Sequence, residues 1–312
     1  MAKPGVLVSA EPGDRKAAVE VAQELERLGF PRVLCPYDYA VPEGDWISGI
    51  SEIYDSMSLC TAILQATTDL EVGTAITLTY TRHPADLAAA ASFNHEISGG
   101  RFILGLGTSH DDILRRFGIE PEKPLSHMRR YIEQLRAAAP NQPLPPIHIA
   151  ALRRRMTRLA AEIADGAINA NLPLSYVPEL LEVIPESKGD TFVFANAAPI
   201  WIDEDRHEGL AFLRRFIGAH MNLPNYTALF TDAGYGDEVK RAVAAVKDGN
   251  QVGVEAAISD RMAADIGIVG TRSQMREKIE AWQDAGVTLT VSTLYTSKHQ
   301  PEATRQVAEL LR

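Results

Sequence analysis

Short apolar segments alternate with amphipathic segments of helical period along the whole chain. An apolar run followed by a helix that covers it is typical of parallel strands with helices packed on the sheet. Strand segments are predicted at residues 6–9, 32–36, 70–77, 102–106, 147–150, 167–169, 191–201 and 287–294. Because these segments follow one another without a clear boundary, we expect one α/β domain over residues 1–312, a (β/α)8 TIM barrel with insertion segments.

The segments between the strands predict the covering helices. Pro84 suits the first turn of a helix, and Gly29 suits the end of one. The expected helices cover residues 15–28, 58–66, 84–97, 125–138, 154–164 and 271–285, with a helical stretch over 204–264 and a last helix at the C-terminus.

Charge and composition exclude several function classes. The formal net charge of −10 argues against a general nucleic-acid or anionic-membrane surface. No apolar run reaches the roughly 18 residues of a membrane span, and the N-terminus does not read as a signal peptide, so we expect a cytoplasmic protein. Cys35 and Cys60 form no disulfide or metal motif, and we interpret both as small buried hydrophobes.

In a barrel of this kind the chemistry lies on the loops that follow the strands. The segment 79–110 is the most informative, because it holds Arg82-His83-Pro84, then Ser98-Gly99-Gly100-Arg101, then Leu104-Gly105-Leu106-Gly107-Thr108. With the segments 159–167, 270–271 and 285–287, it resembles the luciferase-like monooxygenase superfamily, in its branch of coenzyme F420-dependent reductases related to methylene-tetrahydromethanopterin reductase.

The resemblance implies a reaction and a set of site residues. It implies hydride transfer between coenzyme F420 and a small organic substrate, with FMN as the alternative cofactor, in a homodimer. A non-prolyl cis peptide is expected at Ala75–Ile76, behind the cofactor ring. The implied catalytic residues are Asp38 and Tyr39, and the implied cofactor-binding residues are Ala75, Ile76, Thr77, Gly107, Thr108, Ala150, Ala151, Leu152, Arg153, Arg154 and Asn171.

Gly105 and Gly107 follow a strand, so a dinucleotide-binding loop must be considered. The third glycine of that pattern is absent, since His110 stands in its place. We therefore interpret the glycines as allowing close approach of a flat ring, with an ordinary tight turn as the alternative.

Several arginines stand at the expected start of the helix after the fifth strand. Cations are unfavourable at a helix N-terminus unless an anion joins them, so Arg153 and Arg154 indicate a phosphate site. The family pattern Ala-Ala-x-Gly-Pro is not kept here, because Leu152, Arg153 and Arg154 replace it. The alternative is an arginine cluster paired with surface carboxylates.

The remaining sequence patterns say less about function. The run His110-Asp111-Asp112 lacks the spacing of a metal site, so we expect no metal. Arg101 is expected to pair with a neighbouring carboxylate such as Glu96. Apart from the FMN-dependent monooxygenase, the alternative functions are a non-catalytic flavin or deazaflavin carrier and a cofactor-free barrel lyase or hydrolase.

Overall fold

The computed structural model describes residues 3–10, 15–40, 52–202, 206–292, 304–305, 308–309 and 311. For residues 38–40, 52–54, 190, 206 and 292 the description is limited to the backbone. Most of the expected C-terminal helix, and the last two residues of the expected eighth strand, lie outside these ranges.

Parallel strands close into a ring in which each strand pairs with the next and the last pairs with the first. This confirms the predicted (β/α)8 barrel, and every predicted strand segment contributes one strand to the ring. The strands are β1 (Gly5–Leu7), β2 (Arg32–Cys35), β5 (Glu71–Thr74), β7 (Phe102–Gly107), β8 (Ile147–Ala150), β9 (Gly166–Ala170), β10 (Val193–Ile202) and β12 (Thr288–Ser292).

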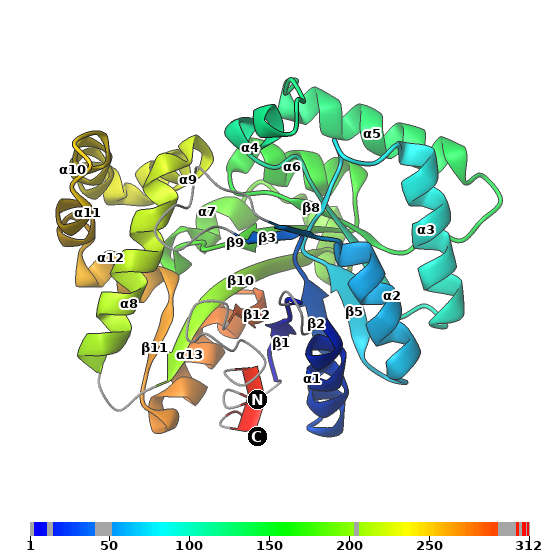
Figure 1. The fold of residues 1–312 in the computed structure, drawn as a ribbon, viewed down its shortest axis with the longest axis horizontal. Coiled ribbons are helices and arrows are strands. Elements are labelled where there is room, and N and C mark those ends of the chain that lie inside the picture. Colours follow the sequence, from blue (N-terminus) through cyan, green and yellow to red (C-terminus); the bar gives the residue numbers. More distant parts are fainter. Residues whose placement is uncertain are drawn as a thin grey trace.

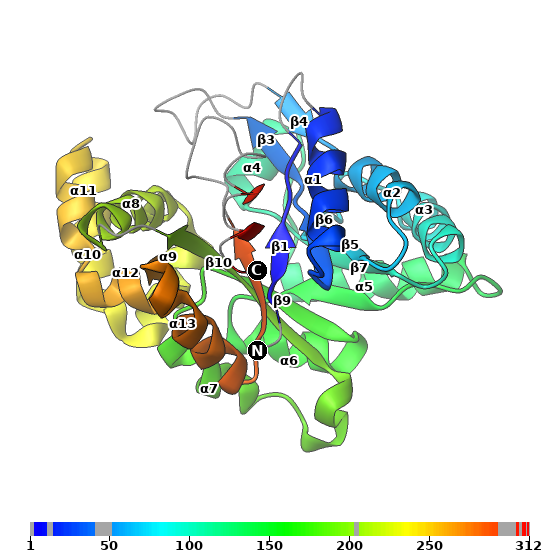
Figure 2. The ribbon, with the colours of Figure 1, turned by 90° about the horizontal axis from the view of Figure 1, so that it is seen from below.

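Helices follow the strands in alternation and cover the ring. Figure 1 shows α1, α2 and α3 on one side of the barrel and α8 with α10 to α12 on the other, and Figure 2 shows the same separation from below. The covering helices are α1 (Arg15–Arg27), α2 (Ser56–Ala66), α3 (Pro84–Ile97), α5 (Pro124–Ala138), α6 (Arg154–Ile163) and α13 (Arg272–Asp284).

The stretch predicted as helical over 204–264 is divided into shorter helices. Pro224 opens a new helix at its first turn, Gly234 takes a left-handed conformation with φ 88°, and the Ser259 side chain caps another helix. The helices are α8 (Arg206–Ala219), α9 (Pro224–Phe230), α10 (Gly236–Lys247), α11 (Gln251–Ala257) and α12 (Asp260–Ile266).

The sequence did not predict several short elements. They include a hairpin of β3 (Asp38–Ala40) and β4 (Glu52–Tyr54), and an edge strand β11 (Ile268–Gly270) beside β10. The remaining ones are β6 (Thr77–Leu78), α4 (Asp111–Arg116) and α7 (Val177–Leu181).

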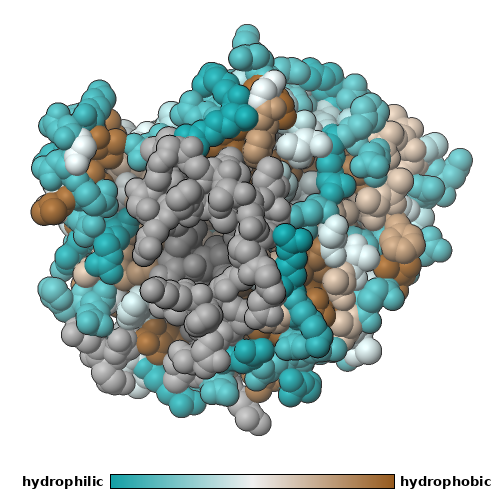
Figure 3. Space-filling model, viewed as in Figure 1, coloured by the Kyte–Doolittle hydropathy of each residue, from teal (hydrophilic) through white to brown (hydrophobic). Residues whose placement is uncertain are grey.

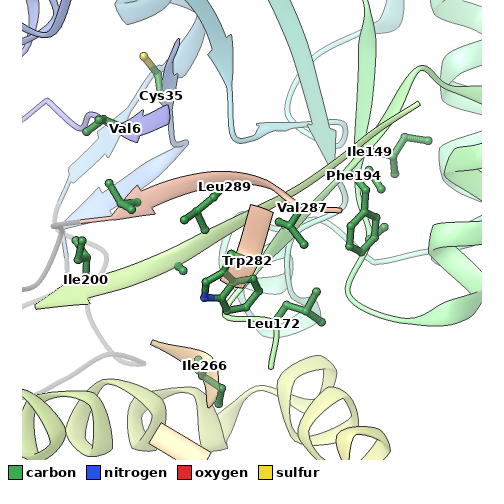
Figure 4. Close-up of a cluster of buried hydrophobic side chains, with 14 of the residues drawn as sticks. Val6, Cys35, Ile149, Leu172, Phe194, Ile200, Ile266, Trp282, Val287 and Leu289 are labelled. Atoms are coloured by element: carbon green, nitrogen blue, oxygen red, sulfur yellow. The ribbon is translucent and has the colours of Figure 1, made fainter. Parts of the chain in front are cut away.

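The main apolar core lies between the strands and their helices. Figure 4 shows Trp282 of α13 beside Val287, which precedes β12, and Leu289 of β12, with Phe194 of β10 nearby, and all of these side chains are buried. Cys35 and Cys60 are free, buried thiols, as predicted. Burial raises the pKa of the Cys60 thiol, so it stays protonated and packs as an apolar group.

The surface is mixed in character. Phe93 of α3 and Val252 of α11 are exposed large apolar side chains, and the space-filling view in Figure 3 has brown, hydrophobic areas among a mostly hydrophilic surface. Within the described part of the chain, no helix has the length and hydropathy to cross a bilayer.

Candidate functional site

The third barrel strand is interrupted between β5 and β6 by a cis peptide bond at Ala75–Ile76, as the resemblance implied. Hydrogen bonds hold this interruption from both neighbouring strands. The Ala75 amide donates to the Cys35 carbonyl at 2.8 Å, and the Tyr37 amide donates to the Ile76 carbonyl at 3.1 Å. The Thr74 hydroxyl donates to the Gly105 carbonyl at 2.7 Å and accepts from the Gly105 amide at 2.9 Å.

This interruption explains Gly105 and Gly107 better than a ligand does. A Cβ atom at Gly105 would lie 1.9 Å from the Thr74 carbonyl oxygen, and one at Gly107 would lie 1.9 Å from Ile76 Cδ1. Our interpretation that these glycines admit a flat ring is therefore corrected: the space beside each is filled by the chain itself. They let the interrupted strand approach β7.

The position that a Cβ atom would take at Gly105 identifies the residues that line the inside of the barrel. Its Cβ would lie 2.9 Å from Ile168 Cδ1, two strands away, so both positions face the interior. Because side chains alternate along a strand, Gly107 and Ala170 face inward as well. The strand register adds further inward positions, among them Ala150 and Ala197.

Small side chains therefore line the upper interior, at the carboxyl ends of the strands. Ile168, the inward residue before Ala170 on β9, is buried, whereas Ala150, Ala170 and Ala197 are only half-buried. Ala75 and Ile76 are half-buried too, and the Ile76 side chain lies against Gly107. We call Ala75, Ile76, Ala150, Ala170 and Ala197 the mouth floor: four alanines and one branched apolar side chain, all reached by solvent.

The other predicted residues of this region have mainly structural contacts. Thr77 is buried, with its hydroxyl 3.0 Å from that of Ser56, so it points away from solvent. Ala151 is buried and its amide donates to the Ile168 carbonyl at 2.9 Å. Thr108 and Leu152 are half-buried at the ends of β7 and β8.

Arg153 and Arg154, predicted to hold a phosphate, are both paired with the protein. Arg153 Nε donates to Asp232 Oδ2 at 2.6 Å. Arg154 Nη1 donates to the Glu179 carbonyl at 2.7 Å and to Glu182 Oε2 at 3.2 Å. The contacts thus match the alternative that we weighed, pairing with surface carboxylates.

Asn171 belongs to a polar and aromatic cluster that the sequence did not predict as a unit. Its backbone is left-handed, with φ 56°, and its side chain is buried with Nδ2 3.1 Å from His220 Nε2. His220 Nδ1 lies 2.8 Å from the Phe216 carbonyl and must donate to it, so Nε2 accepts from Asn171. Burial lowers the pKa of His220 to about 4, and the ring is neutral.

His110 joins this cluster from the end of β7. Its ring centroid lies 5.8 Å from that of Tyr226, which in turn lies 4.6 Å from the His220 ring. Burial lowers the pKa of His110, against the opposing effect of Asp111 and Asp112. His110 Nδ1 is buried without a hydrogen-bond partner in the part of the chain that the structure describes. The sequence had singled out His110 only as a poor metal ligand and as the residue in place of a third glycine.

Asp38 and Tyr39 follow β2 in the β3–β4 hairpin, where Asp38 pairs with Tyr54. Their side chains lie outside the described residues, so their predicted catalytic role stays a prediction. The preceding residue, Tyr37, is half-buried, and its burial and the nearby Asp55 carboxylate raise the pKa of its phenol. Among the described residues, no group of three or more His, Cys, Asp or Glu could hold a metal ion.

The sequence motifs that carry the resemblance build the frame around the site. Arg82 Nη2 donates to Asp55 Oδ1 at 2.7 Å, and His83 and Pro84 begin α3. Arg101 does not pair with Glu96 as expected. It donates to the backbone carbonyls of Leu64, Thr67, Leu70 and Ser98, which ties the end of α2 to β5 and β7.

Comparison with known proteins agrees with this geometry. The sequence profile of the luciferase-like monooxygenase family matches residues 1–289. The chain belongs to this family. A 5,10-methylenetetrahydromethanopterin reductase from Archaeoglobus fulgidus is 27% identical over 278 residues, covering 79% of this chain and 83% of the relative.

Two solved structures share the fold. The coenzyme F420-dependent tetrahydromethanopterin reductase from Methanopyrus kandleri superimposes with a TM-score of 0.74 at 18% identity, covering 99% of this chain and 97% of that one. An F420-dependent secondary alcohol dehydrogenase, solved with an F420-acetone adduct, gives a TM-score of 0.72 at 16% identity, covering 100% and 99%. At 18% and 16% identity, these similarities show that the fold is shared, and they do not show that this chain acts on the same substrates.

Proposed function

We propose that this protein is an oxidoreductase that transfers a hydride between coenzyme F420 and a small organic substrate. The observation that carries the proposal is the mouth floor, where half-buried apolar side chains, most of them alanines, lie at the carboxyl ends of the barrel strands. Ligands of barrel enzymes bind at this end. A relative and two solved structures whose names include F420 dependence support this cofactor over FMN.

The residues present fit a flat ring system. The methyl groups of Ala150, Ala170 and Ala197 project little into the barrel, while Ile76 presents a branched apolar side chain beside them. These residues would hold the ring of the cofactor by apolar contact, as pockets for flat ligands do. Thr108 lies at the end of β7, close in sequence to Gly107, and would bind the chain that leads from the ring.

Bound coenzyme F420 supplies the hydride donor or acceptor of the reaction, and the protein positions it. Oxidising an alcohol also requires a proton acceptor, and reducing a carbonyl requires a proton donor. We assign this role to His110, because its buried ring has a nitrogen without a partner among the described residues and its pKa is lowered. A neutral imidazole can take a proton at one nitrogen.

Titration with each cofactor tests the proposal. We expect purified protein to quench or shift the fluorescence of coenzyme F420, and to bind FMN more weakly. With reduced cofactor and a panel of ketones and enones, we expect oxidation of the cofactor without oxygen uptake. Binding of FMN alone, with oxygen consumption, would replace the proposal by the monooxygenase alternative. Tight F420 binding without turnover of any substrate would favour the carrier.

Substitution of His110 tests the proton role. His110→Gln removes the titratable ring and should lower turnover by roughly 10²–10⁴-fold, the range typical of general acid–base groups, with little change in cofactor binding. His83→Asn, a change at an exposed position that keeps a cap for α3, is the matched control. Equal turnover in the two variants would remove His110 from the mechanism.

A further inference from the structure

A charged groove of about 380 Å³ lies between α5 and α6. Its walls come from the first three turns of both helices, which begin at the same end of the barrel as the mouth floor. The charged residues that line it are Arg129, Arg130, Glu133, Arg155, Arg158 and Glu162.

Positive charge is in excess in this groove. Two of the arginines already have carboxylate partners: Arg129 pairs with Glu162 at 2.5 Å, and Arg130 pairs with Glu122 at 2.6 Å. Arg155 and Arg158 are exposed and have no ion pair or hydrogen bond to any described residue. Glu133 is the remaining carboxylate, so the groove keeps a surplus of cations in a chain whose formal net charge is −10.

The position of the free arginines makes this surplus more unfavourable. Arg155 lies in the first turn of α6, where the helix dipole and the free backbone amides are positive. Arg154, beside it, is stabilised by Glu182 of the neighbouring helical segment, and Arg153 by Asp232. Arg155 and Arg158 turn toward α5 instead, where other arginines meet them. An anion bound between the helices would compensate both the arginines and the helix end.

The groove is also within reach of the mouth floor. Arg155 follows Ala150 by five residues, which places the two Cα atoms at most about 17 Å apart. A ligand whose ring rests on Ala150 could therefore extend an anionic chain over the start of α6 into the groove.

We propose that the groove between α5 and α6 binds a multivalent anion through Arg155 and Arg158. Resting on the proposed function, we assign this anion to the acidic tail of coenzyme F420. The site differs from the Arg153–Arg154 turn that the sequence indicated, because the arginines of that turn already have partners. A free polyphosphate offers the same chemistry, and the experiment separates the two sources.

The experiment uses the full chain and three probes: coenzyme F420, the same deazaflavin with its ribityl chain but no acidic tail, and tripolyphosphate. The test variant is Arg155→Gln with Arg158→Gln, and the control is Arg136→Gln with Arg27→Gln, which removes the same charge at exposed positions away from the groove. We expect the test variant to bind coenzyme F420 about 10–100-fold more weakly, to bind the tailless core unchanged, and to lose most of the salt dependence of binding.

Each outcome has a distinct meaning. If the test variant loses tripolyphosphate binding but keeps its affinity for coenzyme F420, the groove is an anion site for a free polyphosphate and not for the tail. If the test and control variants bind all three probes alike, the groove is not an anion site. If the unaltered protein binds neither deazaflavin, the proposed function fails, while tripolyphosphate still tests the groove.

Discussion

At the scale of single residues, Gly105 and Gly107 are two separate tests of how the interrupted strand packs on β7. Gly107→Ala would place a Cβ 1.9 Å from Ile76 Cδ1, the end of a side chain that can turn aside. We expect a loss of about 1–3 kcal/mol in the free energy of unfolding, as for other overpacked sites, measured by urea denaturation. Cofactor affinity should fall as well, because Ile76 would turn into the mouth.

Two further substitutions distinguish a clash with a side chain, at Gly107, from a clash with the backbone, at Gly105. Ile76→Val removes the Cδ1 atom, so adding it to Gly107→Ala should restore most of the lost stability. Gly105→Ala meets the Thr74 carbonyl oxygen, which no side-chain change can move, and should cost more than Gly107→Ala. A Gly105→Ala protein as stable as the unaltered one would contradict the packing described here.

At the scale of elements, Arg101 joins α2, β5 and β7 through one guanidinium group. Its Nη2 donates to the Leu64 and Thr67 carbonyls at 2.9 and 3.1 Å, and its Nη1 to the Leu70 carbonyl at 2.8 Å. Arg101→Lys keeps the charge but replaces the planar guanidinium by a single ammonium group, which cannot reach all of these carbonyls. We therefore expect a loss of about 2–4 kcal/mol in the free energy of unfolding. Arg27→Lys, at an exposed position on α1, should change it by under about 0.5 kcal/mol. Similar denaturation midpoints for both variants would refute this role.

The sequence predicted the ring strands, and it did not predict short strands that form only by pairing with a distant part of the chain. All ring strands were placed because a buried parallel strand is a continuous apolar run, visible without tertiary information. The short strand β11 was missed, since three residues, Ile268–Gly270, give no period and become a strand only by pairing with β10.

The candidate site divides in the same way. The cis peptide at Ala75–Ile76 followed from the family resemblance and is present. The partners of Arg153 and Arg154 could not be foreseen, because Asp232 and Glu182 come from segments brought close only by the fold. The same is true of His220, which has no local motif and reaches Asn171 across 49 residues of chain.

At the scale of the whole molecule, the barrel interior changes character along its axis. At the amino end of the strands, Arg32 pairs with Glu71 at 2.7 Å, and His148 lies above them in the interior, 4% exposed. Ile168 fills the next level, and alanines form the mouth floor. The lower levels hold the ring of strands together, which leaves the upper end free to be shaped for a ligand. Stability and ligand binding should therefore respond to different substitutions.

The decrease of the free energy of unfolding at acid pH, which we call the acid limb, tests the role of His148 in the lower part of the barrel interior. Burial, with the nearby positive charge of Arg32, lowers the pKa of His148 to about 4, against Asp165. An unfolded chain takes up this proton near pH 6.5, so the free energy of unfolding should be unaffected above that pH and fall as the pH drops from about 6.5 toward 4. The slope from this one group is at most about 1.4 kcal/mol per pH unit. His148→Gln should make the acid limb shallower, by an amount of order 3 kcal/mol at pH 4, in urea denaturation at a series of pH values.

The difference between the two pH curves is the decisive quantity, because absolute stability will fall for any substitution in the barrel interior. His220 has a pKa of about 4 as well, so part of the acid limb should remain in His148→Gln. His83→Asn, at an exposed position, is the control for the loss of an imidazole. Parallel curves for the unaltered protein and His148→Gln would mean that His148 is protonated as readily in the folded barrel as in the unfolded chain. Cofactor affinity at pH 7 should stay unchanged in His148→Gln, since the ring lies below Ile168 and away from the mouth floor.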